Sequence, residues 1–113
     1  MNDRGSTKPI ASTSFYILLA LADEPRYGLG IVEEVAARTG GEVRVGPGTL
    51  YNAIGKMLGE GLIEETGSPD GATDPRRRYY RITRTGRRVL ADEAERLETL
   101  VAAIRSKRIL HGS

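Results

Sequence analysis

Proline and glycine divide the N-terminal half of this chain into three short segments with a helical pattern. The breaks are Glu24-Pro25, Gly40-Gly41, Gly46-Pro47-Gly48 and Gly61. Because proline interrupts a helix and glycine commonly ends one, the pattern predicts helices over residues 12–23, 26–39 and 47–60. A chain of 113 residues with 39% apolar side chains supports one domain around these helices.

Each predicted helix has apolar residues at three- and four-residue spacing, which is typical of a helix with one buried face. The predicted core faces are Phe15, Leu18, Leu19 and Ala22 in the first helix, Ile31, Val32, Val35 and Ala36 in the second, and Leu50, Ile54, Met57 and Leu58 in the third. Ile17 and Leu21 extend the apolar surface of the first helix around its circumference, so this helix needs a cover on two sides. In so small a domain we expect a second subunit to supply the second cover.

Beyond Gly61 the pattern becomes extended. Residues 62–66 and 76–82 are predicted strands joined by a polar loop, and residues 42–45 are predicted as a further short strand. Strand alternation places Arg77, Tyr79 and Arg81 on one face and Arg78, Tyr80 and Ile82 on the other, toward the core. Three helices followed by a β-hairpin indicate a winged helix-turn-helix, a mainly α-helical fold whose third helix enters the DNA major groove.

A long helix is predicted from residue 84 to residue 108. Its apolar residues recur at steps of four and three, and such a heptad seam suits a partner helix. We therefore divide the chain into a flexible tail (1–11), a DNA-binding domain (12–83), a dimerisation helix (84–108) and a second tail (109–113). The residues predicted to form the dimer interface are Phe15, Leu18, Leu90, Ala94, Leu97, Val101 and Ile104.

The formal net charge of +2 conceals an uneven distribution of charge. Residues 75–91 carry seven Arg and no acid, whereas the other ten cations share the rest of the chain with all fifteen acids. A cluster of Arg side chains without neighbouring acids binds a polyanion because it releases the counterions condensed on that polyanion. The residues of this second strand that we predict to bind DNA are Arg76, Arg77, Arg78 and Tyr79. The alternative is that the arginines pair with acids of the second or fourth helix, which would involve Arg84, Arg87 and Arg88 first.

The polar face of the third predicted helix also suits DNA. Thr49, Asn52 and Lys56 lie together, opposite the apolar face. Asn pairs with adenine, Lys suits guanine or phosphate, and Thr bonds to a base edge or a phosphate. At Gly48 and Thr49 the helix N-terminus directs amides outward, which favours a phosphate oxygen. The alternative is an ordinary solvated helix face.

Nothing in the sequence indicates a catalytic site, a metal site or a cofactor. The chain has no cysteine, and its single histidine, His111, has no neighbours with which to bind a metal. Adjacent carboxylates such as Glu33-Glu34 point apart, so acid–base catalysis is not expected. The apolar run 10–22 has the outline of a secretory signal, but Ser and Thr dilute it, and we interpret it as the buried first helix. We therefore expect a cytoplasmic protein without membrane contact.

Short motifs distributed over residues 14–90 carry a family resemblance. They are Tyr27-Gly28, Gly46-Pro47-Gly48-Thr49-Leu50-Tyr51, Gly61-Leu62-Ile63, and Arg78-Tyr79-Tyr80-Arg81-Ile82-Thr83 followed by Gly86. In this order and spacing they resemble the PadR family of bacterial transcription regulators. The single C-terminal helix is similar to that of the short PadR subclass, in which it forms the dimer interface. The chain departs from the family pattern at Asn52, where proline is common, and at Gly55 and Gly59, which replace charged helix formers.

The resemblance implies a homodimeric repressor that binds an inverted-repeat operator in double-stranded DNA. Such repressors often leave DNA on binding a small aromatic or drug-like effector. The DNA contacts that the resemblance implies are Tyr27, Thr49, Tyr51, Asn52 and Lys56, with Arg76, Arg77 and Arg78 on the backbone or minor groove. Two alternatives are a winged helix that binds a protein partner and a ligand sensor with secondary DNA contact. The density of Arg favours DNA over protein, and the low aromatic count disfavours a rich ligand pocket.

Overall fold

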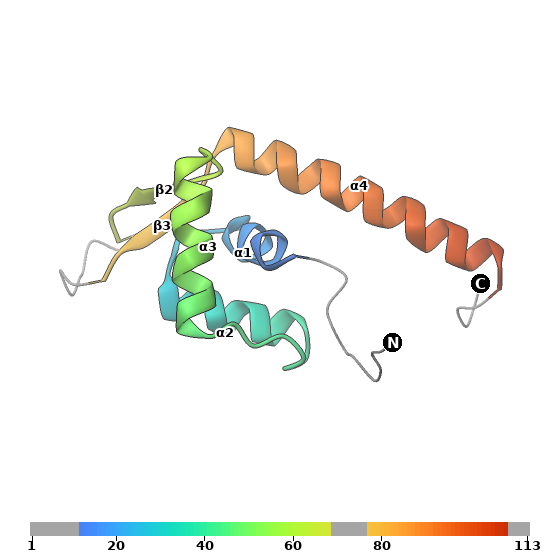
Figure 1. Ribbon diagram of the computed structural model, residues 1–113, viewed down its shortest axis with the longest axis horizontal. Helices are drawn as coiled ribbons and strands as arrows, with labels where there is room; N and C mark the ends of the chain where they lie inside the picture. The colour runs from blue at the N-terminus through green and yellow to red at the C-terminus, as the bar shows by residue number, and fades with distance from the viewer. Residues whose placement is uncertain (1–11, 69–76, 109–113) are drawn as a thin grey trace.

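The computed structural model describes residues 12–68 and 77–108 as four helices and three strands. In chain order the elements are α1 (Thr13–Leu21), β1 (Arg26–Tyr27), α2 (Gly28–Arg38), α3 (Pro47–Gly59), β2 (Ile63–Thr66), β3 (Tyr79–Ile82) and α4 (Arg84–Ser106). The first three helices pack together beside the small sheet, and α4 projects away from them (Figure 1). The predicted order of three helices, a hairpin and a long final helix is therefore confirmed.

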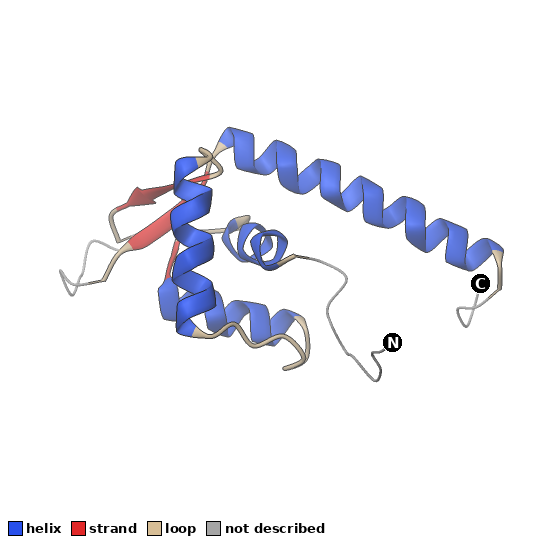
Figure 2. Cartoon of the chain, viewed as in Figure 1, coloured by secondary structure: helices blue, strands red, loops and turns tan. Residues whose placement is uncertain are grey.

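The sheet has one strand more than the predicted hairpin. β1 pairs antiparallel with β3, with Arg26 opposite Tyr80 and Tyr27 opposite Tyr79, so the strand order is β1-β3-β2 (Figure 2). The predicted start of the second helix at Arg26 was wrong, because the residues of β1 are extended and α2 begins at Gly28. This pairing fixes the start of α2 against the base of the wing, by which we mean β2, β3 and the segment between them.

Residues 42–45, which we predicted to be a strand, form a loop. The amide of Val43 donates to the Thr39 hydroxyl at 3.0 Å, and the amide of Glu42 donates to the Thr39 carbonyl at 3.1 Å. These bonds occupy backbone donors that pairing with another strand would need. The buried side chain of Val45 then anchors the loop just before α3.

The hydrophobic core lies where α1, α2, α3 and the sheet meet. Its buried residues are Ile17, Leu18, Ala20, Leu21, Ile31, Val35, Val45, Leu50, Ile54, Met57, Ile63, Tyr80 and Ile82. Two predicted core positions were wrong, since Leu19 is 39% exposed and Leu58 is 38% exposed. Leu18 is only 1% exposed within the single chain, so its predicted place in a dimer interface was also wrong: α2, α3 and α4 surround α1, and this side chain offers no surface to a partner.

The junction between the wing and α4 is held by Thr83. The Thr83 hydroxyl caps α4 by accepting a hydrogen bond from the Gly86 amide at 3.0 Å, and it donates to the Gly61 carbonyl at 2.6 Å. The Thr83 amide donates to the Leu62 carbonyl at 3.0 Å. At Gly86 a Cβ atom would overlap the carbonyl oxygen of Leu62 and lie 2.9 Å from Ile82 Cγ1. The first turn of α4 therefore rests directly on the backbone that follows α3.

α4 has 23 residues, which corresponds to a length of about 35 Å. Its first turns contact β3 and α1, whereas its second half extends beyond the body of the domain (Figure 1). Along that half Leu100 is 47% exposed, Val101 39% and Ile104 38%. No helix among the described residues is long and apolar enough to cross a membrane. An exposed apolar stripe on a projecting helix is typical of a surface that binds another protein element.

Candidate nucleic-acid interface

α3 presents the predicted polar face to solvent. Gly48, Thr49, Asn52 and Lys56 are exposed, while the residues opposite them are buried in the core. The helix begins at Pro47, and no side chain of the described residues caps its N-terminus. Its first turn also lacks acidic residues, so its N-terminal amides are available to an acceptor such as a phosphate oxygen.

A stack of three side chains forms at the base of the wing. The ring centroids of Tyr27 and Tyr79 lie 5.5 Å apart, and the guanidinium carbon of Arg77 lies 4.4 Å from the centroid of the Tyr27 ring. The pairing of β1 with β3 brings these residues together. A guanidinium over an aromatic face gains about 0.5–1 kcal/mol at an exposed site, so Tyr27 holds Arg77 beside the start of α2.

Two of the arginines pair with acids of the wing itself. Arg78 Nη1 lies 3.0 Å from Glu65 Oε2, and Arg81 Nε lies 2.6 Å from Glu64 Oε2. The register of the sheet explains the second pair, because Glu64 lies directly opposite Arg81. All four side chains are largely exposed, so each pair contributes at most about 1 kcal/mol to the stability of the fold. Each arginine can therefore readily leave its acid to bind another anion.

The alternative, in which arginines pair with acids of the second or fourth helix, is not seen for Arg84, Arg87 and Arg88, which have no ion pair among residues 12–68 and 77–108. Arg78 precedes β3 and its side chain is 71% exposed, so it does not face the core as predicted. Arg76 lies outside the described residues.

A hollow of about 310 Å³ opens between the wing and α3. The residues that line it are Tyr27, Gly28, Tyr51, Arg77, Arg78 and Tyr80. A Cβ at Gly28 would meet the hydroxyl of Tyr51, so a larger residue here would displace the end of that side chain. The fold thus brings together four of the predicted DNA-binding residues from three elements of the chain, namely Tyr27, Tyr51, Arg77 and Arg78.

Tyr80 lies at the inner wall of this hollow. Its side chain was correctly predicted to face the core and is only 4% exposed. Burial raises the pKa of its hydroxyl, and the nearby Glu65 and Tyr51 raise the pKa further. The hydroxyl therefore remains protonated at neutral pH and is a hydrogen-bond donor. Within the part of the chain that the structure describes, it has no hydrogen-bond partner.

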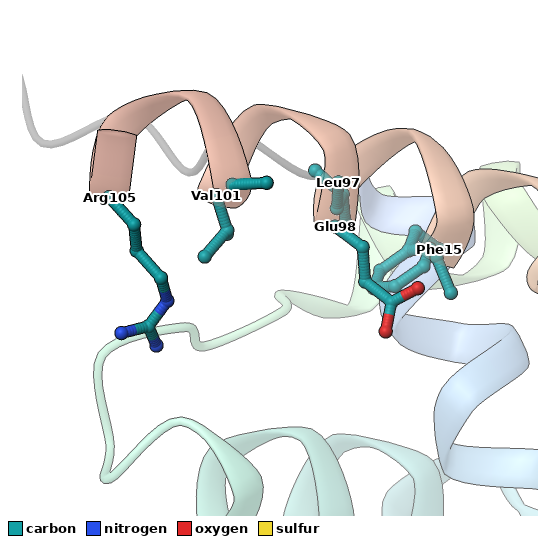
Figure 3. A pocket seen from close by; sticks show the side chains of 7 residues that line it. Phe15, Leu97, Glu98, Val101 and Arg105 are labelled. Carbon is teal, nitrogen blue, oxygen red and sulfur yellow. The ribbon is translucent and has the colours of Figure 1, made fainter. Parts of the chain in front are cut away.

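A separate groove of about 520 Å³ lies between α1 and α4 (Figure 3). Its lining residues are Phe15, Ala94, Leu97, Glu98, Val101, Ala102 and Arg105. Four of the predicted dimer-interface residues, Phe15, Ala94, Leu97 and Val101, therefore lie on one apolar surface, and Ile104 borders a second hollow of about 470 Å³ on α4. Leu90 packs partly against the core of its own domain.

The profile of the transcriptional regulator PadR-like family matches residues 17–92 of this chain. This match extends from α1 through the wing into α4. The chain belongs to the PadR-like family. It is therefore a DNA-binding transcriptional regulator and not an enzyme, and the predicted winged helix-turn-helix fold is confirmed.

Known proteins resemble this PadR-like regulator over most of its length. A transcriptional regulator of Mycobacterium tuberculosis, Rv3488, is 34% identical over 95 residues, which cover 83% of each chain. The structure of a transcriptional regulator from Clostridium thermocellum superposes with a TM-score of 0.70 at 26% identity, covering 86% of this chain and 89% of that one. Bacillus subtilis PadR, solved in complex with operator DNA, has a TM-score of 0.61 at 21% identity, covering 72% of this chain and 45% of that one.

The site contains residues that the sequence analysis did not assign to it. Tyr80 was placed in the core, and Gly28 and Glu65 were given no role. The sequence signal for Glu65 was the alternation of the two predicted strands. Combined with the β2–β3 register, this alternation places Glu65 opposite Tyr80. Among the described residues no group of three or more side chains could hold a metal ion.

Proposed function

We propose that this PadR-like regulator is a homodimeric repressor that binds an inverted-repeat operator in double-stranded DNA and is released by a small aromatic or drug-like effector. The observation that carries the proposal is the hollow shared by α3 and the wing. Because Tyr51 of α3 and Arg77 of the wing line one hollow, α3 and the wing face the same side of the molecule. A winged helix binds DNA with that side, its third helix in the major groove and its wing on the flanking backbone.

The roles of the individual residues follow from their chemistry. Thr49, Asn52 and Lys56 contact base edges or phosphates from the exposed face of α3. The amides at Gly48 and Thr49 donate hydrogen bonds to a phosphate oxygen at the start of the helix. Tyr27, Tyr51 and Tyr79, with Arg76, Arg77 and Arg78, contact the backbone or the minor groove. The structurally similar Bacillus subtilis PadR was solved in complex with operator DNA, which supports DNA binding by this fold.

The homodimer rests on the exposed apolar stripe of α4. Leu97, Val101 and Ile104 follow heptad spacing on the half of the helix that leaves the domain. Phe15 of α1 lines the same groove as Leu97 and Val101 (Figure 3). A second copy packed along this stripe removes the apolar side chains from water. The two α3 helices of such a dimer would enter successive major grooves about 34 Å apart on an inverted repeat.

The effector is proposed to bind where the two copies meet. The groove between α1 and α4 is mainly apolar, with Phe15 at one end and Glu98 and Arg105 at its rim (Figure 3). Such a lining suits a flat aromatic molecule with one polar group. The proposed place of action is the cytoplasm.

Arg77→Ala and Arg78→Ala are each expected to weaken DNA binding by about tenfold at physiological salt. Each lost phosphate contact should also lower the slope of log K against log salt by about 1. The measurement is fluorescence polarisation with the DNA upstream of the protein's own gene, against scrambled duplex, across a salt series. Arg38→Ala is the control, because it removes the same charge from the end of α2, where Arg38 pairs with Glu34.

Unchanged affinity of both variants at every salt concentration would refute the role of the wing. Equal affinity for the upstream and scrambled duplexes would refute a specific operator in that DNA and would favour a winged helix that binds a protein partner.

Glu65→Gln is expected to raise DNA affinity by up to about fivefold. In the wild type, Arg78 must leave the Glu65 carboxylate before it binds a DNA phosphate. The substitution removes this competing carboxylate, so Arg78 is free to bind the phosphate. Glu93→Gln is the matched control, since it removes the same charge and breaks a similar exposed pair, with Arg96. Equal affinities of the two Gln variants would show that Glu65 does not compete with DNA for Arg78.

A further inference from the structure

Tyr80 is almost fully buried as a residue, at 4% exposed, and its hydroxyl has no acceptor in the described part of the chain, residues 12–68 and 77–108. Most buried side-chain polar atoms in proteins have a partner, and an exception calls for a physical explanation. Tyr80 lines the hollow between the wing and α3, so an acceptor for this hydroxyl can reach it from outside the chain.

The rest of the lining consists mainly of cations and donors. Arg77 and Arg78 contribute guanidinium groups, and Tyr51 contributes a phenolic hydroxyl. Gly28 is the first residue of α2, and its N-cap residue Tyr27 makes no side-chain hydrogen bond to the helix. The lining therefore favours a ligand with negative charge and several acceptor oxygens.

One carboxylate lies close to this site. Glu65 is the cross-strand neighbour of Tyr80, and its side chain is bound to Arg78 at 3.0 Å. The charge of Glu65 opposes an incoming anion, and its ion pair with Arg78 offsets part of that opposition. The volume of about 310 Å³ corresponds to roughly ten water molecules in the liquid, which leaves room for one phosphate group.

We propose that this hollow holds one phosphate of the operator backbone in each half-site, and that the Tyr80 hydroxyl donates a hydrogen bond to it. The inference rests on the proposed DNA-binding function and adds a residue to it. Arg77 and Arg78 neutralise the phosphate, while Tyr51 and the start of α2 enclose it. A phosphodiester and free inorganic phosphate share this chemistry, so the experiment separates them.

The test is Tyr80→Phe, which removes only the hydroxyl. DNA affinity is expected to fall by about tenfold at every salt concentration, which is the range for a lost hydrogen bond to a charged group. The salt slope should not change, because a neutral hydroxyl displaces no counterions, whereas Arg77→Ala lowers the slope. The melting temperature should stay the same or rise, since the removed group has no partner in the free chain.

Tyr16→Phe is the matched control, because Tyr16 packs against the core from α1 and lies outside the hollow. Wild-type affinity of Tyr80→Phe, with Arg77→Ala weakened, would overturn the phosphate site and leave the wing function intact. Wild-type affinity of both variants would overturn the wing function itself. A fall in both the melting temperature and the affinity of Tyr80→Phe would also overturn the site, because the hydroxyl would then have a structural partner.

A second arm tests inorganic phosphate alone at matched ionic strength. If phosphate raises the melting temperature of the wild type but not of Tyr80→Phe, while both bind DNA equally, the ligand is the free anion. That result would overturn the assignment to the operator backbone. Weaker DNA binding by Tyr80→Phe would support it, whether or not the two proteins differ in their response to phosphate.

Discussion

Gly86→Ala is expected to destabilise the folded domain by at least about 3 kcal/mol. The new methyl group would overlap the Leu62 carbonyl oxygen and lie 2.9 Å from Ile82 Cγ1. The Leu62 oxygen cannot move away easily, because it accepts the Thr83 amide at 3.0 Å in the junction that joins the wing to α4. Relief of the overlap would have to separate α4 from that junction. The measurement is the free energy of unfolding from a urea titration followed by circular dichroism.

Gly55→Ala is the control for this substitution. Gly55 lies in the exposed interior of α3, and a Cβ there meets no atom within 4 Å. Alanine exceeds glycine in helix propensity by about 1 kcal/mol, so this variant should be more stable than the wild type. The same chemical change is thus expected to have opposite signs at two helical positions. Equal stability of Gly86→Ala and the wild type would show that α4 does not rest on the Leu62 carbonyl.

Local sequence signals predicted the helices well because the information lay within each segment. Pro47 begins α3 as predicted, and Leu50, Ile54 and Met57 are buried at the predicted spacing. The polar face of the same helix followed from the same periodicity. Alternation likewise predicted that Tyr80 would be buried in β3.

The errors occurred where the structure depends on distant residues. β1 has two residues, too few for a pattern, and it exists because β3 pairs with it. The alternation at 42–45 indicated a strand, but the bonds to Thr39 hold a loop there instead. The partner of Arg78 is Glu65, thirteen positions away, and only the register of the sheet brings them together. The hollow beside Tyr80 requires three elements at once, so no single segment indicates it.

The double substitution of Leu97→Glu and Val101→Glu is expected to convert the proposed dimer to monomers and to reduce operator affinity by about 100-fold or more. Val101 is 39% exposed on the projecting half of α4, and Leu97 lies beside it in the groove that Phe15 borders. Two carboxylates on this stripe would have to lose their hydration when a second copy packs against it, which opposes association strongly. A monomer also loses the gain in affinity from two linked half-sites, which is typically about 10²–10⁴.

The measurements are sedimentation velocity for the oligomeric state and fluorescence polarisation for DNA binding. Far-UV circular dichroism should show an unchanged helix content, because the core of the single chain contains neither residue. Val89→Glu is the matched control, since Val89 is 40% exposed on the same helix but lies outside the heptad seam. A double variant that still sediments as a dimer would refute the stripe as the interface. A monomeric variant that binds the operator as tightly as the wild type would show instead that one copy suffices for DNA binding, which would contradict the inverted repeat.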